Sequence, residues 1–438
     1  MDLDNLDTFR IATCDLNGQM RGKRMPQKDQ RKLASGDLRM PLSVLNVDIW
    51  GADIINSPLL FASGDGDGYL LPTNRGPVPM PWLDQPSALV GMWMFEEDGR
   101  PFEGDPRHAL AQILDRYAAR GWQVVAATEL EFYLIDDSAE SLRPPKDPAS
   151  NRKIDSSAIL SLQQLDAFEA FFSELYQSCA QMGINAQAAS SEAGIGQFEI
   201  SLQHGDALRI ADDTWLFKTL LKGLARKHGY AASFMAKPYP NDAGNGLHLH
   251  FSVIGEAGEN IFDDGTKQGS PLLQNAIAGC LATMRAATLG FAPHANSYTR
   301  MDPENHAPTS ICWGYENRTA ALRIPAGAHR ARRIEHRVAG GDINPFLTLS
   351  LILGAALLGI EDDLTPPPPI TGNAYIQDLP QLIHSWSEAI DMFENDPMIA
   401  RILPAQLIEN FSLTKRQELD GLKNIPQEEH WKIYLETV

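Results

Sequence analysis

One short segment, residues 128–132 (TELEF), constrains the fold of this chain most strongly. Two carboxylates alternate with apolar residues inside a stretch rich in Val, Thr, Phe and Tyr, which predicts a β-strand. Residues two apart on a strand point to the same face, so Glu129 and Glu131 are expected side by side. On a buried face these anions require a metal ion or arginine beside them; a solvent-exposed face is the alternative.

Two later segments carry comparable chemistry. Residues 192–199 place Glu192 and Glu199 around two glycines, whose backbone freedom can bring both carboxylates to one point, although a plain surface loop fits equally well. Residues 244–252 (GNGLHLHFS) put two histidines and a serine on one face of a predicted strand. A neutral imidazole is a common ligand of divalent metals, and a histidine in the core is the alternative.

Arginines gather between residues 300 and 337, in a chain that is otherwise acidic. They are Arg300, Arg318, Arg323, Arg330, Arg332, Arg333 and Arg337. Guanidinium groups bind phosphate and carboxylate through two parallel hydrogen bonds, although a surface salt-bridge network is also consistent with such a cluster. Glu335 lies among these arginines, which suggests a carboxylate reserved for a metal ion. Together these residues indicate a pocket for divalent cations, polyphosphate and an acidic substrate.

No glycine-rich phosphate loop with a Walker lysine and no dinucleotide-binding glycine motif is present in the sequence. A nucleotide would therefore have to be held by metal ions and arginines.

Composition excludes several classes of function. The formal charge of −19 over 438 residues argues against a nucleic-acid partner. Residues 346–360 form the longest apolar segment, too short to cross a bilayer of roughly 30 Å, and are expected to form a buried helix. The four cysteines lie far apart and the amino terminus resembles no secretory signal, so we expect a cytoplasmic protein without disulfides or membrane contact.

The pattern of elements predicts an α+β protein with a β-rich domain over residues 1–105 and a larger domain over residues 106–438. The runs on either side of Asn17-Gly18 predict a hairpin. Predicted helices cover residues 108–121, 165–183, 213–229 and 271–290, and predicted strands cover residues 121–136, 196–203, 246–253 and 319–327.

Several long motifs, in this order, resemble those of glutamine synthetases across nearly the whole chain. They are DLNGQMRGKRMP, ATELEFYLID, EAGIGQFEISL, FMAKPYP, AGNGLHLHFS, NSYTRMDPENHAP, WGYENRTAALRIP and RRIEHRVAGGDINPFL. The chain is most similar to the γ-glutamylputrescine synthetase branch. The resemblance implies an amino-terminal β-grasp domain and a catalytic domain built from a twisted antiparallel sheet and helices.

The resemblance also implies roles for individual residues. One divalent ion, Mg²⁺ or Mn²⁺, would be held by Glu131, Glu192 and Glu199, and a second by Glu129, His248 and Glu335. The residues implied to contact ATP are His250, Ser252, Arg323 and Arg333. Those implied to hold glutamate are Arg300, Arg337 and the loop of Gly244, Asn245 and Gly246, and Arg318 would stabilise the transferred phosphoryl group.

Members of this family assemble rings with active sites between subunits, which implies a homo-oligomer, with a dodecamer of two hexameric rings expected. Asp48 or Asp67 would then reach a neighbouring subunit's site. The segment after Pro369 is shorter than the one that carries the regulatory adenylylated tyrosine in many glutamine synthetases, so that regulation is not expected here.

One position departs from the ammonia-using members. Their glutamate, which helps to bind and deprotonate ammonium, is replaced by His306, as suits a bulkier amine. An amine with a pKa of about 10 must lose a proton before it attacks, and His306 and Glu304 are the candidate bases. His306 could instead only shape the pocket.

The implied reaction is ATP-dependent formation of a γ-glutamyl amide through γ-glutamyl phosphate, with putrescine or another polyamine favoured as the amine. Ethanolamine, a small alkylamine or ammonia are the alternatives within the family. A two-metal hydrolase, which would not need so many arginines, and a catalytically inactive paralogue are alternatives from other classes.

Overall fold

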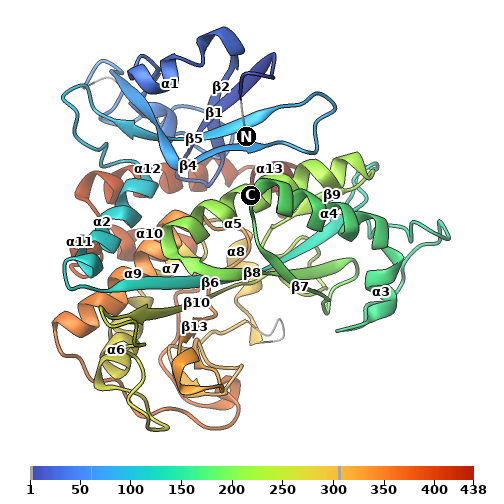
Figure 1. The fold of residues 1–438 in the computed structure, drawn as a ribbon. Coiled ribbons are helices and arrows are strands. Elements are labelled where there is room, and N and C mark those ends of the chain that lie inside the picture. Colours follow the sequence, from blue (N-terminus) through green and yellow to red (C-terminus); the bar gives the residue numbers. More distant parts are fainter. Residues whose placement is uncertain (1–2, 61, 304–306) are drawn as a thin grey trace.

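The computed structural model describes residues 3–60, 62–303 and 307–438, which form two β-sheets surrounded by helices (Figure 1). The first sheet has five strands in the order β2-β1-β5-β4-β3. Its strands are β1 (Thr8–Cys14), β2 (Met20–Pro26), β3 (Arg39–Pro41), β4 (Asp67–Pro79) and β5 (Ala88–Phe95). The predicted hairpin around Asn17-Gly18 is confirmed, since β1 and β2 pair antiparallel, and β1 runs parallel to β5 on its other side.

The second sheet has eight strands in the order β11-β12-β13-β10-β6-β8-β7, with β9 paired to β6. Its strands are β6 (Gln123–Ile135), β7 (Ala186–Ser191), β8 (Gln197–Asp206), β9 (Ala231–Ser233), β10 (Leu247–Ile254), β11 (Trp313–Tyr315), β12 (Leu322–Ile324) and β13 (Ile334–His336). The expectation of an antiparallel sheet is wrong at one edge, because β11 and β12 pair in parallel. They can do so because residues 316–321 loop back between them.

The longer helices are α2 (Pro106–Ala118), α4 (Glu169–Met182), α5 (Ala207–Lys227), α6 (Pro271–Met284), α9 (Pro345–Glu361), α10 (Trp386–Asn395) and α12 (Ala405–Leu422). The shorter ones are α1 (Lys32–Ser35), α3 (Leu162–Ala167), α7 (Thr288–Phe291), α8 (Ser297–Arg300), α11 (Ile399–Ile402) and α13 (Trp431–Thr437). The helix predicted over residues 165–183 breaks at Phe168, and the one predicted over residues 271–290 ends at Met284.

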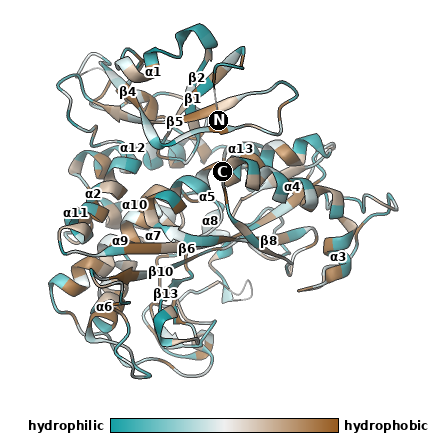
Figure 2. Cartoon of the chain, in the orientation of Figure 1, coloured by the Kyte–Doolittle hydropathy of each residue, from teal (hydrophilic) through white to brown (hydrophobic). Residues whose placement is uncertain are grey.

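The second sheet is polar on one face and apolar on the other. Leu130, Ile200 and Leu249 on β6, β8 and β10 are at most 1% exposed and belong to the main hydrophobic core, which also takes in α5, α6 and α9. The expected buried helix is α9, which Figure 2 shows mainly in hydrophobic colours. None of the helices formed by the described residues has the length and apolarity to cross a membrane.

Helix α12 lies beneath the first sheet and joins it to the rest of the molecule (Figure 1). Lys415 and Glu418 on this helix are completely buried, and their charges are 2.9 Å apart. Asn17, from the turn between β1 and β2, donates to Glu418 Oε1 over 2.8 Å. A buried polar cluster therefore connects the amino-terminal hairpin to the carboxy-terminal helices.

Candidate active site

Strand register brings the predicted ligands together on the polar face of the second sheet. Strand β10 lies between β6 and β13, so His248 is opposite Glu129 and His250 is opposite Glu335. On the other side of β6, Glu131 is opposite Glu199 on β8. Because side chains alternate between faces along each strand, these residues share one surface while their apolar neighbours fill the core.

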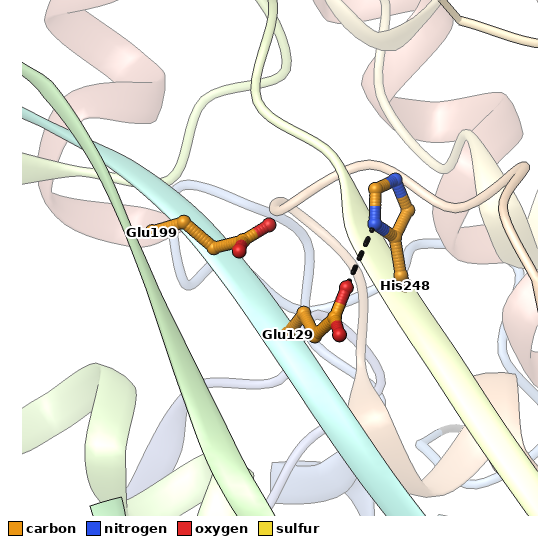
Figure 3. Close-up of side chains that lie close together, drawn as sticks. All are labelled: Glu129, Glu199 and His248. Atoms are coloured by element: carbon orange, nitrogen blue, oxygen red, sulfur yellow. Dashed lines mark hydrogen bonds and ion pairs between the residues drawn. The ribbon is translucent and has the colours of Figure 1, made fainter. Parts of the chain in front are cut away.

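Two groups of side chains could each hold a metal ion. The first is Glu129, Glu199 and His248, which point toward one another in Figure 3, and the second is Glu129, His250 and Glu335. Within each group the candidate ligand atoms lie within 4.8 Å of one another. Glu129 belongs to both groups, with its Oε2 3.2 Å from His248 Nδ1 and its Oε1 3.2 Å from His250 Nε2.

These groups differ in membership from the two predicted ligand sets. Glu131 and Glu192, predicted as ligands, are in neither group. Glu131 accepts a hydrogen bond from Gly246 N over 2.6 Å, and Glu192 accepts one from Ser190 over 3.0 Å. His250, predicted to contact ATP, joins the second group. Five of the six predicted ligands nevertheless share one area of the sheet, because strand register fixes the positions of Glu129, Glu131, Glu199, His248 and Glu335. Glu192 lies in the loop between β7 and β8.

The electrostatics of the cluster favour bound cations. Burial, followed by the charges of Glu129 and Glu131, raises the pKa of Glu199 to about 9. Burial and the charge of Glu131 raise the pKa of Glu192 to about 7. Carboxylates that repel one another in this way suit a divalent cation, for which carboxylate oxygen and imidazole nitrogen are common ligands.

Two carboxyls in the same cluster shift in the opposite direction. Burial alone would raise the pKa of Glu129, but hydrogen bonds and charge from His248 and His250 hold it well below its ordinary value. Burial likewise acts upward on the pKa of Glu335, but the combined charges of Arg337, His248, His250 and Arg323 lower it below its ordinary value. Carboxyls with raised and with lowered pKa values thus lie side by side across β6, β8 and β13.

The predicted arginines surround this cluster. Arg323 donates to Glu335 Oε2 over 2.8 Å, and Arg337 donates to the other oxygen of the same carboxylate. Arg300 and Arg337 are 5% and 6% exposed, so an acidic substrate beside them would meet charges that water screens weakly. The exposed Arg318 lies near enough to Glu192 for its charge to lower the pKa of that carboxyl.

The glycine loop of residues 244–246 packs against Arg300 and Glu131. A Cβ on Gly246 would lie 2.9 Å from Arg300 Nη2 and 3.4 Å from Glu131 Oε2, so only glycine fits without displacing the guanidinium. The Asn245 side chain is fully buried and donates to Ser233 O and Met235 O. The backbone N–H of Asn245 donates to Ala236 O, and its carbonyl accepts from Gly341 N, so both its backbone and its amide hold the loop in place.

A pocket of about 630 Å³ opens beside the second metal group, within the range of nucleotide-sized sites. Its lining includes Glu129 and three of the predicted ATP contacts: His250, Ser252 and Arg333. Arg323, the fourth, lies outside it and pairs with Glu335 and Glu316. The lining of the pocket also contains Gln187 on β7 and His204 on β8, which sequence reasoning missed because no motif marks them and only strand pairing places them there.

The remaining predicted residues lie away from this surface or outside the described residues. Asp48 is 3% exposed, and its oxygens accept hydrogen bonds from Trp50 N, Ala52 N and the Gln417 side chain of its own chain. Asp67 is exposed at the start of β4. Glu304 and His306 fall outside the described residues.

Comparison with known proteins agrees with this geometry. Residues 103–434 match the model of the glutamine synthetase catalytic domain. The chain is 35% identical to γ-glutamylputrescine synthetase of Escherichia coli K12 over 95% of this chain and 89% of that protein. It is 32% identical to a glutamate–isopropylamine ligase of a Pseudomonas species, over 95% of this chain and 92% of that protein.

Among solved structures, a glutamine synthase homologue superimposes with a TM-score of 0.86 at 26% identity, covering 100% of both chains. The strand register, the carboxylate and histidine cluster and these similarities agree in one conclusion. The chain belongs to the glutamine synthetase family.

Proposed function

We propose that this enzyme is an ATP-dependent ligase that joins the γ-carboxylate of glutamate to an amine. The observation that carries the proposal is the convergence, on one sheet face, of a carboxylate and histidine cluster, a nucleotide-sized pocket and two buried arginines. A simple hydrolase would need the metal cluster but not so many arginines.

The chemistry follows from what the residues can bind. Arg300, Arg337 and the backbone of residues 244–246 would hold glutamate, and His250, Ser252 and Arg333 would hold ATP. Bound divalent ions would neutralise the phosphates and the developing charge, with Glu129, Glu199, His248 and Glu335 among their ligands. Arg318 and Arg323 would add positive charge near the transferred phosphoryl group.

The reaction then proceeds in two steps, in which first ADP and then phosphate is the leaving group. An oxygen of the glutamate γ-carboxylate attacks the terminal phosphorus of ATP and ADP leaves, giving γ-glutamyl phosphate. The amine nitrogen attacks the carbonyl carbon, phosphate leaves and the nitrogen loses a proton. That proton requires a base, and we propose His306 or Glu304 for this role because the ammonium-binding glutamate of ammonia-using members is absent.

The amine we favour is putrescine or another polyamine. The name of one relative specifies putrescine and that of another specifies isopropylamine, so both a diamine and a small alkylamine are supported by similarity. A dication also suits a chain with a net charge of −19. Ethanolamine and ammonia are the remaining alternatives.

The test is release of ADP that depends on both glutamate and Mg²⁺, measured with ammonium, putrescine, spermidine, ethanolamine and monoalkylamines. Selective turnover with putrescine or spermidine is expected. Turnover with ammonium alone would contradict the amine-ligase assignment. Hydrolysis without ATP would support the two-metal hydrolase instead.

We extend the proposal to the organisation of the protein. A division near residue 105 is supported by a separate hydrophobic cluster formed entirely by residues between Leu3 and Phe102. The parallel pairing of β1 with β5 supports a β-grasp assignment for that domain. We further propose a cytoplasmic, Mg²⁺-dependent homo-oligomer, a dodecamer of two hexameric rings with Asp48 or Asp67 near a neighbouring site, which mass measurement in solution will test.

A further inference from the structure

We infer that Gln197 is a positioning residue that holds the glutamate-binding loop and the nearby metal ligands at a fixed separation. Its side chain lies between two segments that the proposed function uses for different purposes: residues 192–197, which carry Glu192, and residues 244–246. The inference rests on the proposed function for the identity of the ligands, and on the hydrogen bonds of Gln197 for everything else.

Gln197 uses both ends of its amide. Its Oε1 accepts a hydrogen bond from Gly194 N over 2.8 Å, which closes the loop that follows Glu192. Its Nε2 donates to Gly244 O over 2.9 Å and to Asn245 Oδ1 over 3.0 Å. The side chain is 2% exposed, so water cannot replace these bonds without opening the structure.

The same amide nitrogen lies 3.5 Å from Glu131 Oε2. That oxygen also accepts the Gly246 N–H over 2.6 Å, so Glu131 and the glycine loop are joined directly as well as through Gln197. One amide thus contacts the glycine loop, the loop after Glu192 and the Glu131 carboxylate, and its orientation limits how each can move relative to the others.

A second side chain joins the same two loops. Tyr133 donates to Ala243 O over 2.7 Å, and a Cβ on Gly194 would lie only 1.8 Å from its hydroxyl oxygen. Gly194 therefore lets the loop after Glu192 approach Tyr133 closely. Because the loops are braced at two points, the loss of Gln197 is expected to loosen them without unfolding the sheet.

The test replaces Gln197 in the full-length protein and measures Mn²⁺ binding by electron paramagnetic resonance without nucleotide. Gln197→Met keeps the length of the side chain but removes both hydrogen-bonding ends, and Gln197→Glu removes the donor and adds an anion beside Glu131. Residues that orient metal ligands typically change metal affinity by about 10- to 100-fold when replaced. We expect the affinity for Mn²⁺ to weaken by this factor at one of the two metal sites. The loss is expected to be larger for Gln197→Glu than for Gln197→Met, because the new carboxylate faces the acceptor oxygens of Gly244 and Asn245.

Kinetics provide the second readout. The KM for glutamate is expected to rise about tenfold, because the loop proposed to bind glutamate is held less firmly. The KM for ATP is expected to stay within about twofold, because Gln197 does not line the pocket proposed for ATP. Gln203→Glu is the matched control, since Gln203 is exposed on the same strand and the chemical change is identical. It is expected to leave both measurements unchanged.

Unchanged Mn²⁺ affinity and glutamate KM in folded Gln197→Met would overturn the inference and leave the proposed function intact. Wild-type protein that binds neither Mn²⁺ nor Mg²⁺ would overturn the proposed function, and this inference with it. If Gln197→Met does not fold, Gln197→Asn retains the amide but is one methylene too short to reach Gly244 O, and the same two measurements decide the question on that variant.

Discussion

Glu192 and Glu199 carry pKa values of about 7 and about 9, caused first by burial and then by neighbouring carboxylates. Unfolding returns each group to a pKa of about 4.3. At pH values between about 4.3 and the folded-state pKa, the folded protein therefore holds more protons than the unfolded chain. Stability from these groups is therefore full below about pH 4 and is lost as the pH rises through 7 and 9. The melting temperature of the metal-free protein is expected to fall between pH 6 and pH 9.

Two comparisons isolate this effect. Saturating Mg²⁺ or Mn²⁺ is expected to reduce the pH dependence, because a bound cation replaces the protons that the carboxyls otherwise need. Glu199→Gln is expected to do the same without metal. An equal fall in melting temperature for wild type and Glu199→Gln, each measured without metal, would show that other groups control the dependence.

Gly246 offers a second prediction for a single residue. In Gly246→Ala the new Cβ would lie 2.9 Å from Arg300 Nη2, so the guanidinium must move from the position proposed for glutamate binding. We expect the KM for glutamate to rise about 10- to 100-fold, since each lost charge-assisted hydrogen bond costs about 1.5–3 kcal/mol. Gly66→Ala is the control, because nothing lies within 4 Å of a Cβ at that position, and its KM is expected to match wild type.

Individual elements differ in how well the sequence predicts them. Strands β8 and β10 alternate apolar and polar residues over residues 197–203 and 247–253, and β6 does so around its two glutamates. That period is imposed by a core on one face, so it is visible in the sequence. Strands β11, β12 and β13 are three residues long and carry no such period. Their pairing, including the parallel contact, depends on residues far apart in the chain.

The site residues likewise differ in whether a local motif or only long-range strand pairing reveals them. The types of the metal-ligand residues were evident from motifs, because carboxylates and histidines at alternate strand positions share a face. Gln187 and His204 were not, because they reach the pocket only through the pairing of β8 with β6 and of β7 with β8. The sharing of Glu129 by both groups was also beyond sequence reasoning, since it depends on how β6, β10 and β13 pair.

Helix α2 begins at a junction between the two sheets. The Asp105 carboxylate accepts from Arg107 N over 2.8 Å, as a helix cap, and from Met94 N over 3.2 Å at the end of β5. Asp105→Ala is expected to lower the free energy of unfolding by about 1–3 kcal/mol. This loss exceeds that of an ordinary helix cap, because the buried Met94 N–H is also left without its acceptor.

Urea denaturation will measure that loss. Asp105→Asn retains an oxygen acceptor and is expected to lose less than Asp105→Ala. Ser161→Ala removes the cap of the short helix α3, in a more exposed part of the chain, and is expected to cost under about 1 kcal/mol. Equal losses for Asp105→Ala and Ser161→Ala would contradict a joining role for Asp105.

At the scale of the whole molecule, the buried Lys415–Glu418 pair and Asn17 connect the amino-terminal hairpin to α12. Glu418→Leu leaves the Lys415 ammonium buried without its carboxylate and is expected to cost about 3–5 kcal/mol in the free energy of unfolding. Lys415→Met combined with Glu418→Leu removes both charges and is expected to cost less than the sum of the single changes. Guanidinium denaturation of the four proteins in this cycle measures the coupling, and additive losses would contradict it.

The position of Glu129 has a consequence for how the whole enzyme responds to its ionic surroundings. Since this one carboxylate belongs to both candidate metal groups, an ion in either group changes the charge and orientation available to the other. The two occupancies are then thermodynamically linked, and each ion alters the affinity for the other by the same factor. Activity as a function of free Mg²⁺ would depart from a simple hyperbola. The concentration of the ion, as well as that of the amine, would then control the rate of the enzyme.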